Sequence, residues 1–216
     1  MSIFDTLAIY DDESSRSAAI NMAIDEALLE SANAPTIRFY RWDHAALSFG
    51  YFGKFADVAN EPRDLVRRWT GGGIVLHGDD LTYGLMIPAG DSAFAGSPMS
   101  IYEKTHAAIQ CAIGAAAELA LQPSAKISDS CFANPVRADV MLDGKKIAGA
   151  AQRKTRRGLL QQGSIQYVDL APDFAERFAH ELAANVIDCK IDNHILERAH
   201  EIAAAKYGTD AWLRRR

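Results

Sequence analysis

The sequence predicts an α+β protein in which helices flank a mixed, largely antiparallel sheet. Its periodic segments run in the order helix, several strands, helix, strands and helices. The strand-like segments follow one another too closely for the regular crossover helices that a parallel sheet needs. Asp143-Gly144 also separates two of these segments, and this dipeptide is typical of a tight antiparallel turn. These three observations favour a sheet built mainly from hairpins.

The first half of the chain begins with a predicted amphipathic helix over residues 17–31. Its apolar residues recur at helical spacing, as Ile20, Ala23, Ile24, Ala27 and Leu28. Short segments rich in aromatic and β-branched residues follow, separated by Gly, Asp and Pro, as expected for strands. The predicted strands cover residues 36–42, 46–51, 65–69, 74–77 and 81–87.

The second half contains a long helix, three strands and two further helices. Ser100 and Glu103 match a capping box, which predicts the start of a helix that ends near residue 121. Residues 122–134 show no periodicity. Strands are predicted over residues 139–142, 146–150 and 158–167. The last two helices are predicted over residues 171–184 and 193–207, with Gly208 ending the second.

Composition and charge exclude several classes of function. The chain has 216 residues, which is enough for one domain, and its net charge of -5 argues against nucleic-acid and membrane partners. No apolar run is long enough to span a membrane, and the first residues lack a signal-peptide core. Cys111, Cys131 and Cys189 are odd in number and widely spaced, so we expect no disulfide framework, no metal site and a cytoplasmic location.

The segment RRWTGGG, residues 67–73, combines two arginines with an unusually bare backbone. Three consecutive glycines allow a ligand or another strand to approach closely, and their N–H groups together with Arg67 and Arg68 could bind an anion. The alternative is a flexible turn with both arginines in solvent. The segment matches neither a P-loop nor a dinucleotide fingerprint. His77 follows directly, and we expect it to position a substrate or close a pocket rather than to transfer a proton.

A second candidate segment, DGKKIAG, lies at residues 143–149. Successive strand residues point to opposite faces, so one of Lys145 and Lys146 can enter a pocket, beside space left by Gly149 and Ala150. Exposure of both lysines is the alternative. Cys131 lies upstream in a turn-rich segment and could be a nucleophile if Lys146 lowers its pKa. Its alternative role is that of a small buried hydrophobic residue.

Three motifs, in this order, resemble the lipoate-protein ligase and octanoyltransferase superfamily, which shares its catalytic fold with biotin protein ligases. They are NMAIDEALLE at residues 21–30, RRWTGGGIVLHGDDLTYG at residues 67–84, and GKKIAGAAQRK with the later QGSI, within residues 144–165. The resemblance covers about residues 21–165. It implies a single catalytic domain over residues 1–216, with a biotin/lipoate protein ligase-like fold and no C-terminal accessory domain.

The resemblance implies a narrow tunnel that holds an octanoyl or lipoyl chain beside the triglycine segment. Lys146 would contact the acyl carbonyl. The residues implied in substrate binding are Arg67, Arg68, Gly71, Gly72, Gly73, His77, Tyr83, Gly149 and Ala150. The acyl group would end on a lysine of a small acidic partner, either a lipoyl carrier domain or a glycine-cleavage H protein, and acyl carrier protein is a possible donor.

Members of the superfamily use two chemistries. Ligases use ATP and Mg to form an acyl-adenylate, whereas transferases pass the acyl group through a cysteine thioester and need no cofactor. The sequence CFANP, residues 131–135, is similar to the cysteine loop of one transferase group. The resemblance therefore favours an octanoyltransferase that uses Cys131 and Lys146, with the ligase and a non-catalytic acyl- or carrier-binding paralogue as alternatives.

Two positions depart from the family pattern, and one basic cluster stands outside it. Gly78 separates His77 from the following aspartate, and Gln161 occupies a place where family members often have histidine. Either change could alter the substrate or weaken activity. The cluster is predicted to steer an acidic carrier domain, although an exposed charged loop is the alternative; its members are Arg153, Lys154, Arg156 and Arg157.

Overall fold

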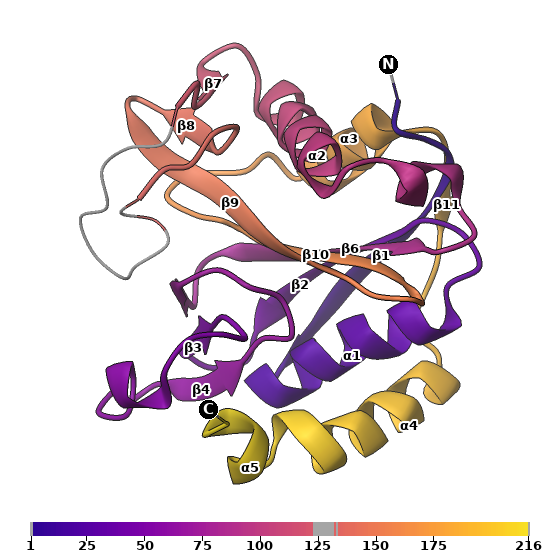
Figure 1. Ribbon diagram of the computed structural model, residues 1–216. Coiled ribbons are helices and arrows are strands. Elements are labelled where there is room, and N and C mark those ends of the chain that lie inside the picture. The colour runs from indigo at the N-terminus through magenta and orange to yellow at the C-terminus, as the bar shows by residue number, and fades with distance from the viewer. Residues whose placement is uncertain (1, 123–131, 133, 216) are drawn as a thin grey trace.

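The protein has an α+β fold around one large sheet (Figure 1). The structure is a computed structural model and describes residues 2–122, 132 and 134–215. The sheet has eight strands. In their order across the sheet they are β11 (Ala183–Asp188), β1 (Phe4–Arg16), β2 (Thr36–Trp42), β6 (Leu81–Pro88), β10 (Gly158–Ile165), β9 (Lys145–Lys154), β8 (Val140–Leu142) and β7 (Ala117–Leu119). β1 pairs in parallel with β11 and β2, and every other pairing in this sheet is antiparallel. The predicted fold class is confirmed.

A smaller sheet lies beside the large one and carries the triglycine segment. Its three strands are β4 (Asp64–Arg67), β3 (Ala46–Phe49) and β5 (Ile74–His77), in that spatial order. β3 pairs in parallel with β4 and antiparallel with β5. Residues 68–73 therefore connect two strands that flank the same central strand.

Helices cover both faces of the large sheet (Figure 1). On one face lie α2 (Pro98–Ile113) and α3 (Phe174–Leu182). On the other lie α1 (Ala18–Ser31) and α4 (Asn193–Ile202), followed by a π-helical segment (Ala203–Tyr207) and the short α5 (Asp210–Leu213). Two 3-10 turns, η1 (Phe55–Asp57) and η2 (Ser92–Ala95), lie in connections.

Central strands of the large sheet are buried on both faces, because each face has its own apolar layer. Along β2, Ile37 and Phe39 pack in the cluster beneath α2 and α3. Tyr40 and Trp42 belong instead to the cluster that includes the apolar side of α1. This placement follows the alternation of strand side chains. Among the described residues, no helix has the length and apolar character needed to cross a membrane.

The structure corrects several predicted elements. The helix predicted from Ser100 to residue 121 instead spans Pro98–Ile113, because Ser97 is its N-cap and accepts a hydrogen bond from the Ser100 N–H at 3.1 Å. Gly114, with φ of 115°, ends it. β1, β7 and β11 were not predicted. The sequence of β1 is not typical of a strand, because its second half is acidic. It forms a strand because it pairs along both edges, with β2 and with β11.

Candidate active site

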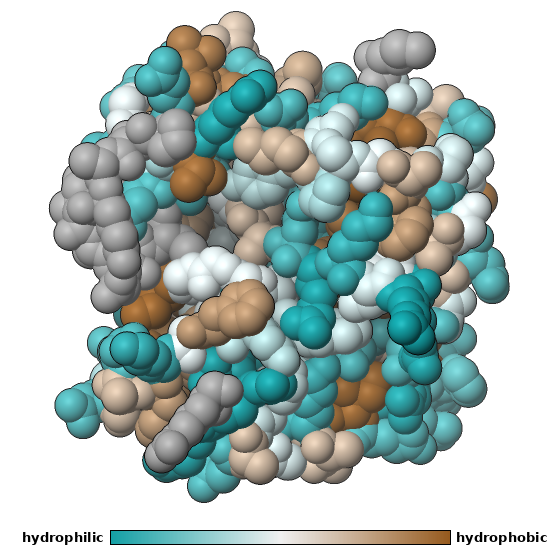
Figure 2. Space-filling view, in the orientation of Figure 1, coloured by the Kyte–Doolittle hydropathy of each residue, from teal (hydrophilic) through white to brown (hydrophobic). Residues whose placement is uncertain are grey.

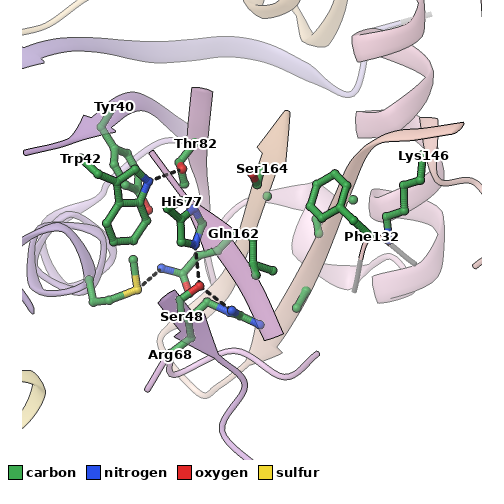
Figure 3. Close-up of a pocket in the computed structure, with 16 residues that line it drawn as sticks. Tyr40, Trp42, Ser48, Arg68, His77, Thr82, Phe132, Lys146, Gln162 and Ser164 are labelled. Carbon is green, nitrogen blue, oxygen red and sulfur yellow. Dashed lines mark hydrogen bonds between the residues drawn. The ribbon is translucent and has the colours of Figure 1, made fainter. Parts of the chain in front are cut away.

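A pocket opens between the small sheet and strands β9 and β10 (Figure 3). About 470 Å³ of empty space lies within its walls, and this figure includes the part that is open to solvent. Tyr40 and Trp42 lie at one end of the view, and Lys146 and Phe132 lie at the opposite end. Gln162 lies between them. The pocket therefore has an aromatic end and a cationic end, joined by the floor formed by β10.

The Lys146 ammonium marks the cationic end. Lys145 is exposed and Lys146 is 8% exposed, so the two lysines lie on opposite faces of β9, as predicted. Lys146 Nζ lies 2.8 Å from Asp139 Oδ2 and 5.4 Å from the centre of the Phe132 ring. Gly149, which also lines the pocket, leaves the space that the lysine side chain occupies: a Cβ at this position would lie 2.4 Å from Lys146 Cε.

Asp139 holds the lysine in place and is itself held by several donors. The Tyr102 hydroxyl donates to Asp139 Oδ1 at 2.5 Å, and the Val136 N–H donates to Oδ2 at 2.6 Å. Burial and the adjacent carboxylate raise the pKa of Tyr102, so its hydroxyl stays protonated as a donor. A fully buried carboxylate needs such compensation. Sequence reasoning missed Asp139, although a charged residue at the start of an apolar strand was an available signal.

His106 supports the loop that precedes Asp139. Its Nδ1 donates to the Ala138 carbonyl at 2.7 Å, and Ala138 adopts a left-handed φ of 67°. Burial lowers the pKa of His106 to about 4, so the ring is neutral at neutral pH, with the proton on Nδ1. His106 therefore fixes backbone geometry behind the Asp139–Lys146 pair, and no sequence pattern pointed to this role.

His77 lies at the aromatic end of the pocket and both of its ring nitrogens are engaged. The ring stacks on Trp42 with centroids 4.0 Å apart, Nδ1 lies 2.8 Å from Asp80 Oδ2, and Nε2 lies 2.6 Å from Ser48 Oγ. Burial lowers the pKa of His77, although Asp80 opposes this, and the neutral ring donates to Asp80 and accepts from Ser48. Arg68 donates to Ser48 Oγ at 2.6 Å, which completes the chain.

His77 has a carboxylate partner although Gly78 separates it from the following aspartate. Asp79 is exposed, whereas Asp80 is buried and accepts from the His77 ring and from the Gly78 N–H. Burial alone would raise the pKa of Asp80, but its hydrogen bonds, including one from Ser164, lower it overall. The carboxylate partner of His77 is therefore Asp80 and not Asp79, which directly follows Gly78.

The two arginines of the RRWTGGG segment have different surroundings. Arg68 lines the pocket and donates to the carbonyls of Gly71 and Gly73. Arg67 is buried outside the pocket lining, where its guanidinium donates to backbone carbonyls only; the acceptors are Tyr51, Gly53, Trp212, Leu213 and Arg215. Arg67 therefore joins the C-terminal helix to the loop after β3.

The triglycine segment permits close backbone packing. Gly72 has a φ of 83°, and a Cβ on the neighbouring Gly50 would lie 2.0 Å from the Gly72 carbonyl oxygen. None of the three glycines is among the residues that line the described pocket. Arg68, bonded to two of their carbonyls, connects the segment to the pocket wall. Their direct role in substrate binding stays a prediction.

Replacing Arg67 by methionine should destabilise the fold and release its last residues. The change removes the guanidinium hydrogen bonds to five backbone carbonyls, and buried carbonyls that lose a donor are costly, so we expect a loss of about 3 kcal/mol. Denaturant unfolding measures the loss, and limited proteolysis should show faster cleavage after Lys206. Arg177→Met, at an exposed helix position, is the control and should change neither result. Unchanged stability and proteolysis in Arg67→Met would contradict this role.

Gln162 connects the pocket floor to the buried face of α1. Its side chain donates to Asp25 Oδ2 at 2.8 Å and accepts from Thr70 Oγ1 at 2.9 Å. Asp25 also accepts from Arg38 and Tyr40, both at 3.1 Å. Desolvation raises the pKa of Asp25, although Arg38 and its hydrogen bonds oppose the shift. The NMAIDEALLE motif therefore contributes a fully buried carboxylate beneath the pocket.

Several residues predicted to bind substrate or carrier lie away from the pocket. Tyr83 is fully buried behind β10 and accepts from Gln161 at 3.1 Å, outside the pocket lining. Lys154 donates to the Phe94 carbonyl, and Arg157 pairs with Glu30. Gly149 and Ala150 do line the pocket. Cys131 lies outside the described residues.

No group of three or more His, Cys, Asp or Glu side chains suited to a metal ion occurs within residues 2–122, 132 and 134–215. The charged groups of the pocket are Lys146, Arg68 and the residues that pair with them. The pocket is thus arranged to receive a group with negative or partial negative charge at its cationic end.

Comparison with known proteins finds relatives that are named octanoyltransferases. An octanoyltransferase LipM from Oceanobacillus iheyensis is 41% identical over 162 residues, which cover 68% of this chain and 59% of that protein. LipM from Brevibacillus brevis is 33% identical over 198 residues, covering 82% of this chain and 71% of that protein. The match to the first of these relatives therefore spans less than two thirds of its length.

Solved structures share the fold across nearly the whole chain. A putative lipoate protein ligase from T. acidophilum with bound lipoic acid superposes with a TM-score of 0.73 at 20% identity, covering 97% of this chain and 98% of that one. A lipoate-protein ligase A bound with ATP gives a TM-score of 0.72 at 20% identity, with 97% and 98% coverage. The family model for the lipoyl protein ligase A/B catalytic domain matches residues 17–197. The chain belongs to the lipoyl protein ligase A/B catalytic domain family.

Proposed function

We propose that the protein transfers an octanoyl or lipoyl group to the lysine of a lipoyl carrier domain, through a thioester on Cys131. The observation that carries the proposal is the Lys146 ammonium, which is buried at one end of a pocket whose other end is aromatic. An acyl chain places its apolar tail and its carbonyl at opposite ends in the same way. Support also comes from the relatives named as octanoyltransferases.

In the first step, the Cys131 thiolate attacks the carbonyl carbon of an acyl thioester. The intermediate collapses to a Cys131 thioester and expels the donor thiolate, which takes a proton from water. In the second step, the amine of the carrier lysine attacks, the Cys131 thiolate leaves, and the new amide nitrogen loses a proton to solvent. A thioester is higher in free energy than an amide, so the reaction needs no ATP.

The contribution of Lys146 is electrostatic. Its ammonium donates hydrogen bonds to the oxyanion that develops on the acyl carbonyl in both steps, and one such donor typically contributes about 3 kcal/mol. Asp139 balances the charge of the lysine in the resting pocket and holds the side chain at 2.8 Å, so little reorganisation is needed when the oxyanion forms. Phe132, next to Cys131 in the chain, lies against the same ammonium.

A protein carrier is the proposed acyl acceptor. One solved neighbour, 19% identical, is described as part of a bi-partite lipoate protein ligase studied with its E2 lipoyl domain from Thermoplasma acidophilum. ATP occurs with another neighbour, a lipoate-protein ligase A that is 20% identical. At this identity the likeness concerns the fold alone, so we take the chemistry from the transferase relatives and make ATP dependence an outcome of the test.

Intact-mass measurement of the enzyme after incubation with an octanoyl thioester tests the proposal. We expect one octanoyl adduct without ATP, absent in Cys131→Ala and retained in Cys111→Ala, since Cys111 is exposed on α2 outside the pocket. Transfer that survives Cys131→Ala and requires Mg-ATP would instead support a ligase. Absence of both adduct and carrier modification would support a non-catalytic paralogue.

A further inference from the structure

Cationic and aromatic side chains alternate in a row beside the pocket, around the C-terminal helix. Arg153 lies over Trp69 and over Tyr51, with its guanidinium carbon 4.9 and 4.5 Å from the two ring centres. Arg215 continues the row between Tyr51 and Trp212, with its guanidinium carbon 4.3 and 4.9 Å from the two ring centres. We call these five residues the cationic ladder. α5 lies beside β4 in Figure 1, and hydrophilic side chains gather near the C-terminal end in Figure 2.

The two arginines of the cationic ladder carry charge without a carboxylate partner among the described residues. Other cations nearby are paired: Lys206 with Glu26 at 2.5 Å, and Arg214 with Asp210 at 3.5 Å. The only hydrogen bond of the Arg153 guanidinium within the described chain goes from Nη1 to the Trp69 carbonyl at 3.2 Å, and its buried Nε has no partner there. A local positive potential therefore remains on a chain whose net charge is -5.

The cationic ladder is directly adjacent to the pocket. Arg153 follows Ala151, a lining residue, by two positions on β9 and therefore points to the same face of the strand. Trp69 follows the lining residue Arg68 in the chain. The Tyr51 N–H donates to the Thr70 carbonyl at 2.9 Å, which holds the ladder against the connection between β4 and β5.

An exposed apolar side chain completes this surface. Phe52 is 86% exposed, and its ring packs edge-on against Tyr51 with centroids 5.0 Å apart. An exposed aromatic residue surrounded by polar groups is typical of the centre of a protein interface. Arginine and aromatic residues are likewise the types enriched at such surfaces.

We propose that the cationic ladder and Phe52 form the docking surface for the acidic carrier domain. The inference rests on the proposed function and goes beyond it by assigning the surface that receives the partner. Unpaired guanidinium groups attract and orient an acidic protein, and Phe52 supplies apolar contact area. Because the ladder adjoins the pocket, a carrier bound to it can extend its lysine toward Lys146.

The remaining basic residues of the sequence cluster lie elsewhere. Arg156 is at the β9–β10 turn, beyond the end of β9 at Lys154 and five residues after the lining residue Ala151. Arg157 at the same turn is already paired with Glu30. Only Arg153 of that cluster belongs to the cationic ladder, so Arg156 provides a charge-matched control at a distance from the pocket.

A nucleic acid fits this surface less well. Two arginines lie over the central ring of the row, Tyr51, and the Phe52 ring contacts it edge-on, which leaves less area for stacking on bases. Two unpaired arginines are also few compared with the roughly six to ten phosphate contacts of a typical nucleic-acid binder. The geometry therefore favours an acidic protein partner.

Calorimetric titration of a recombinant acidic lipoyl domain into the full chain, at low and high salt, tests the proposal without requiring chemistry. We expect Arg215→Glu to raise the Kd about tenfold at low salt, with a smaller effect at high salt. Arg215→Met, which removes the positive charge and adds no negative one, should give a smaller increase. Phe52→Ala should raise the Kd at both salt concentrations. Arg156→Glu should change the Kd less than twofold.

The same variants separate this proposal from the proposed function. Acylation of the enzyme by a small uncharged octanoyl thioester should be unchanged in Arg215→Glu and Phe52→Ala, because neither residue lines the pocket. Equal effects of Arg215→Glu and Arg156→Glu, or a Kd independent of salt, would overturn the docking surface. Tighter binding of a single-stranded oligonucleotide than of the lipoyl domain would also overturn it. Failure of acylation in the wild-type protein would instead contradict the proposed chemistry.

Discussion

Replacement of Lys146 by methionine is expected to lower acyl transfer about 10²- to 10³-fold, which is the effect of removing one oxyanion donor. The ammonium lies at the cationic end of the pocket, and Asp139 holds it at 2.8 Å. Single-turnover acylation by an octanoyl thioester measures the loss. Because Asp139 stays buried without its cation, this single change should also destabilise the fold.

A second variant separates the catalytic loss from the structural one. Lys146→Met combined with Asp139→Asn removes both charges while the asparagine can still bond to the Tyr102 hydroxyl and the Val136 N–H. We expect the double variant to recover much of the stability and none of the activity. Recovery of activity in the double variant, or a rate in Lys146→Met within threefold of wild type, would contradict the assigned role.

Gly149→Ala disturbs the same ammonium without removing it. The added methyl group would lie 2.4 Å from Lys146 Cε and 2.6 Å from Nζ, so the flexible lysine must move while the backbone stays. Acylation should therefore fall by about tenfold, equivalent to about 1.4 kcal/mol, with little change in thermal stability. Gly78→Ala, where a Cβ meets no atom within 4 Å, should change neither.

Replacement of Asp25 by alanine is expected to give the largest loss of stability. The buried carboxylate accepts from Arg38, Tyr40 and Gln162, and its removal leaves those donors short of a partner in a closed interior. Breaking a buried charged network typically costs about 3–5 kcal/mol. Arg38 keeps its bonds to Asp12, at 2.8 and 3.2 Å, so we expect the lower end, about 3 kcal/mol.

Calorimetry and denaturant unfolding measure the effect of Asp25→Ala. For a chain of 216 residues, about 3 kcal/mol corresponds to a fall in Tm of roughly 6–12 °C. Asp79→Asn removes an exposed carboxylate and should shift Tm by less than about 2 °C. A Tm for Asp25→Ala equal to that of this control would show that the network beneath the pocket does not stabilise the fold.

Local patterns in the sequence were sufficient to predict several strands of both sheets. β2 at Thr36–Trp42 and β5 at Ile74–His77 coincide with the predicted segments, because both are short, apolar and bounded by turn residues. β1 and β11 were missed because they become strands through pairing between the two ends of the chain, with Phe4 opposite Ala183. No local periodicity reports a pairing between residues so distant in sequence.

The same distinction applies to the candidate site. Strand alternation correctly separated Lys146 from Lys145, since it depends on the local backbone alone. The partners that hold Lys146 come from elsewhere: Asp139 begins the neighbouring hairpin, and Tyr102 lies on α2. For Arg67 the local motif was misleading. The motif resembles a ligand-binding segment, but the guanidinium donates hydrogen bonds to the carbonyls of α5 and nearby loops.

Transfer from a preformed acyl-enzyme tests the central claim most directly. Enzyme loaded with octanoate from a thioester donor is freed of donor, mixed with a lipoyl carrier domain without ATP, and both proteins are followed by intact mass. The proposed mechanism predicts that the octanoyl group leaves the enzyme and appears on the carrier lysine as an amide that resists hydroxylamine. An acyl group that stays on the enzyme, or carrier modification that occurs only with Mg-ATP, would contradict it.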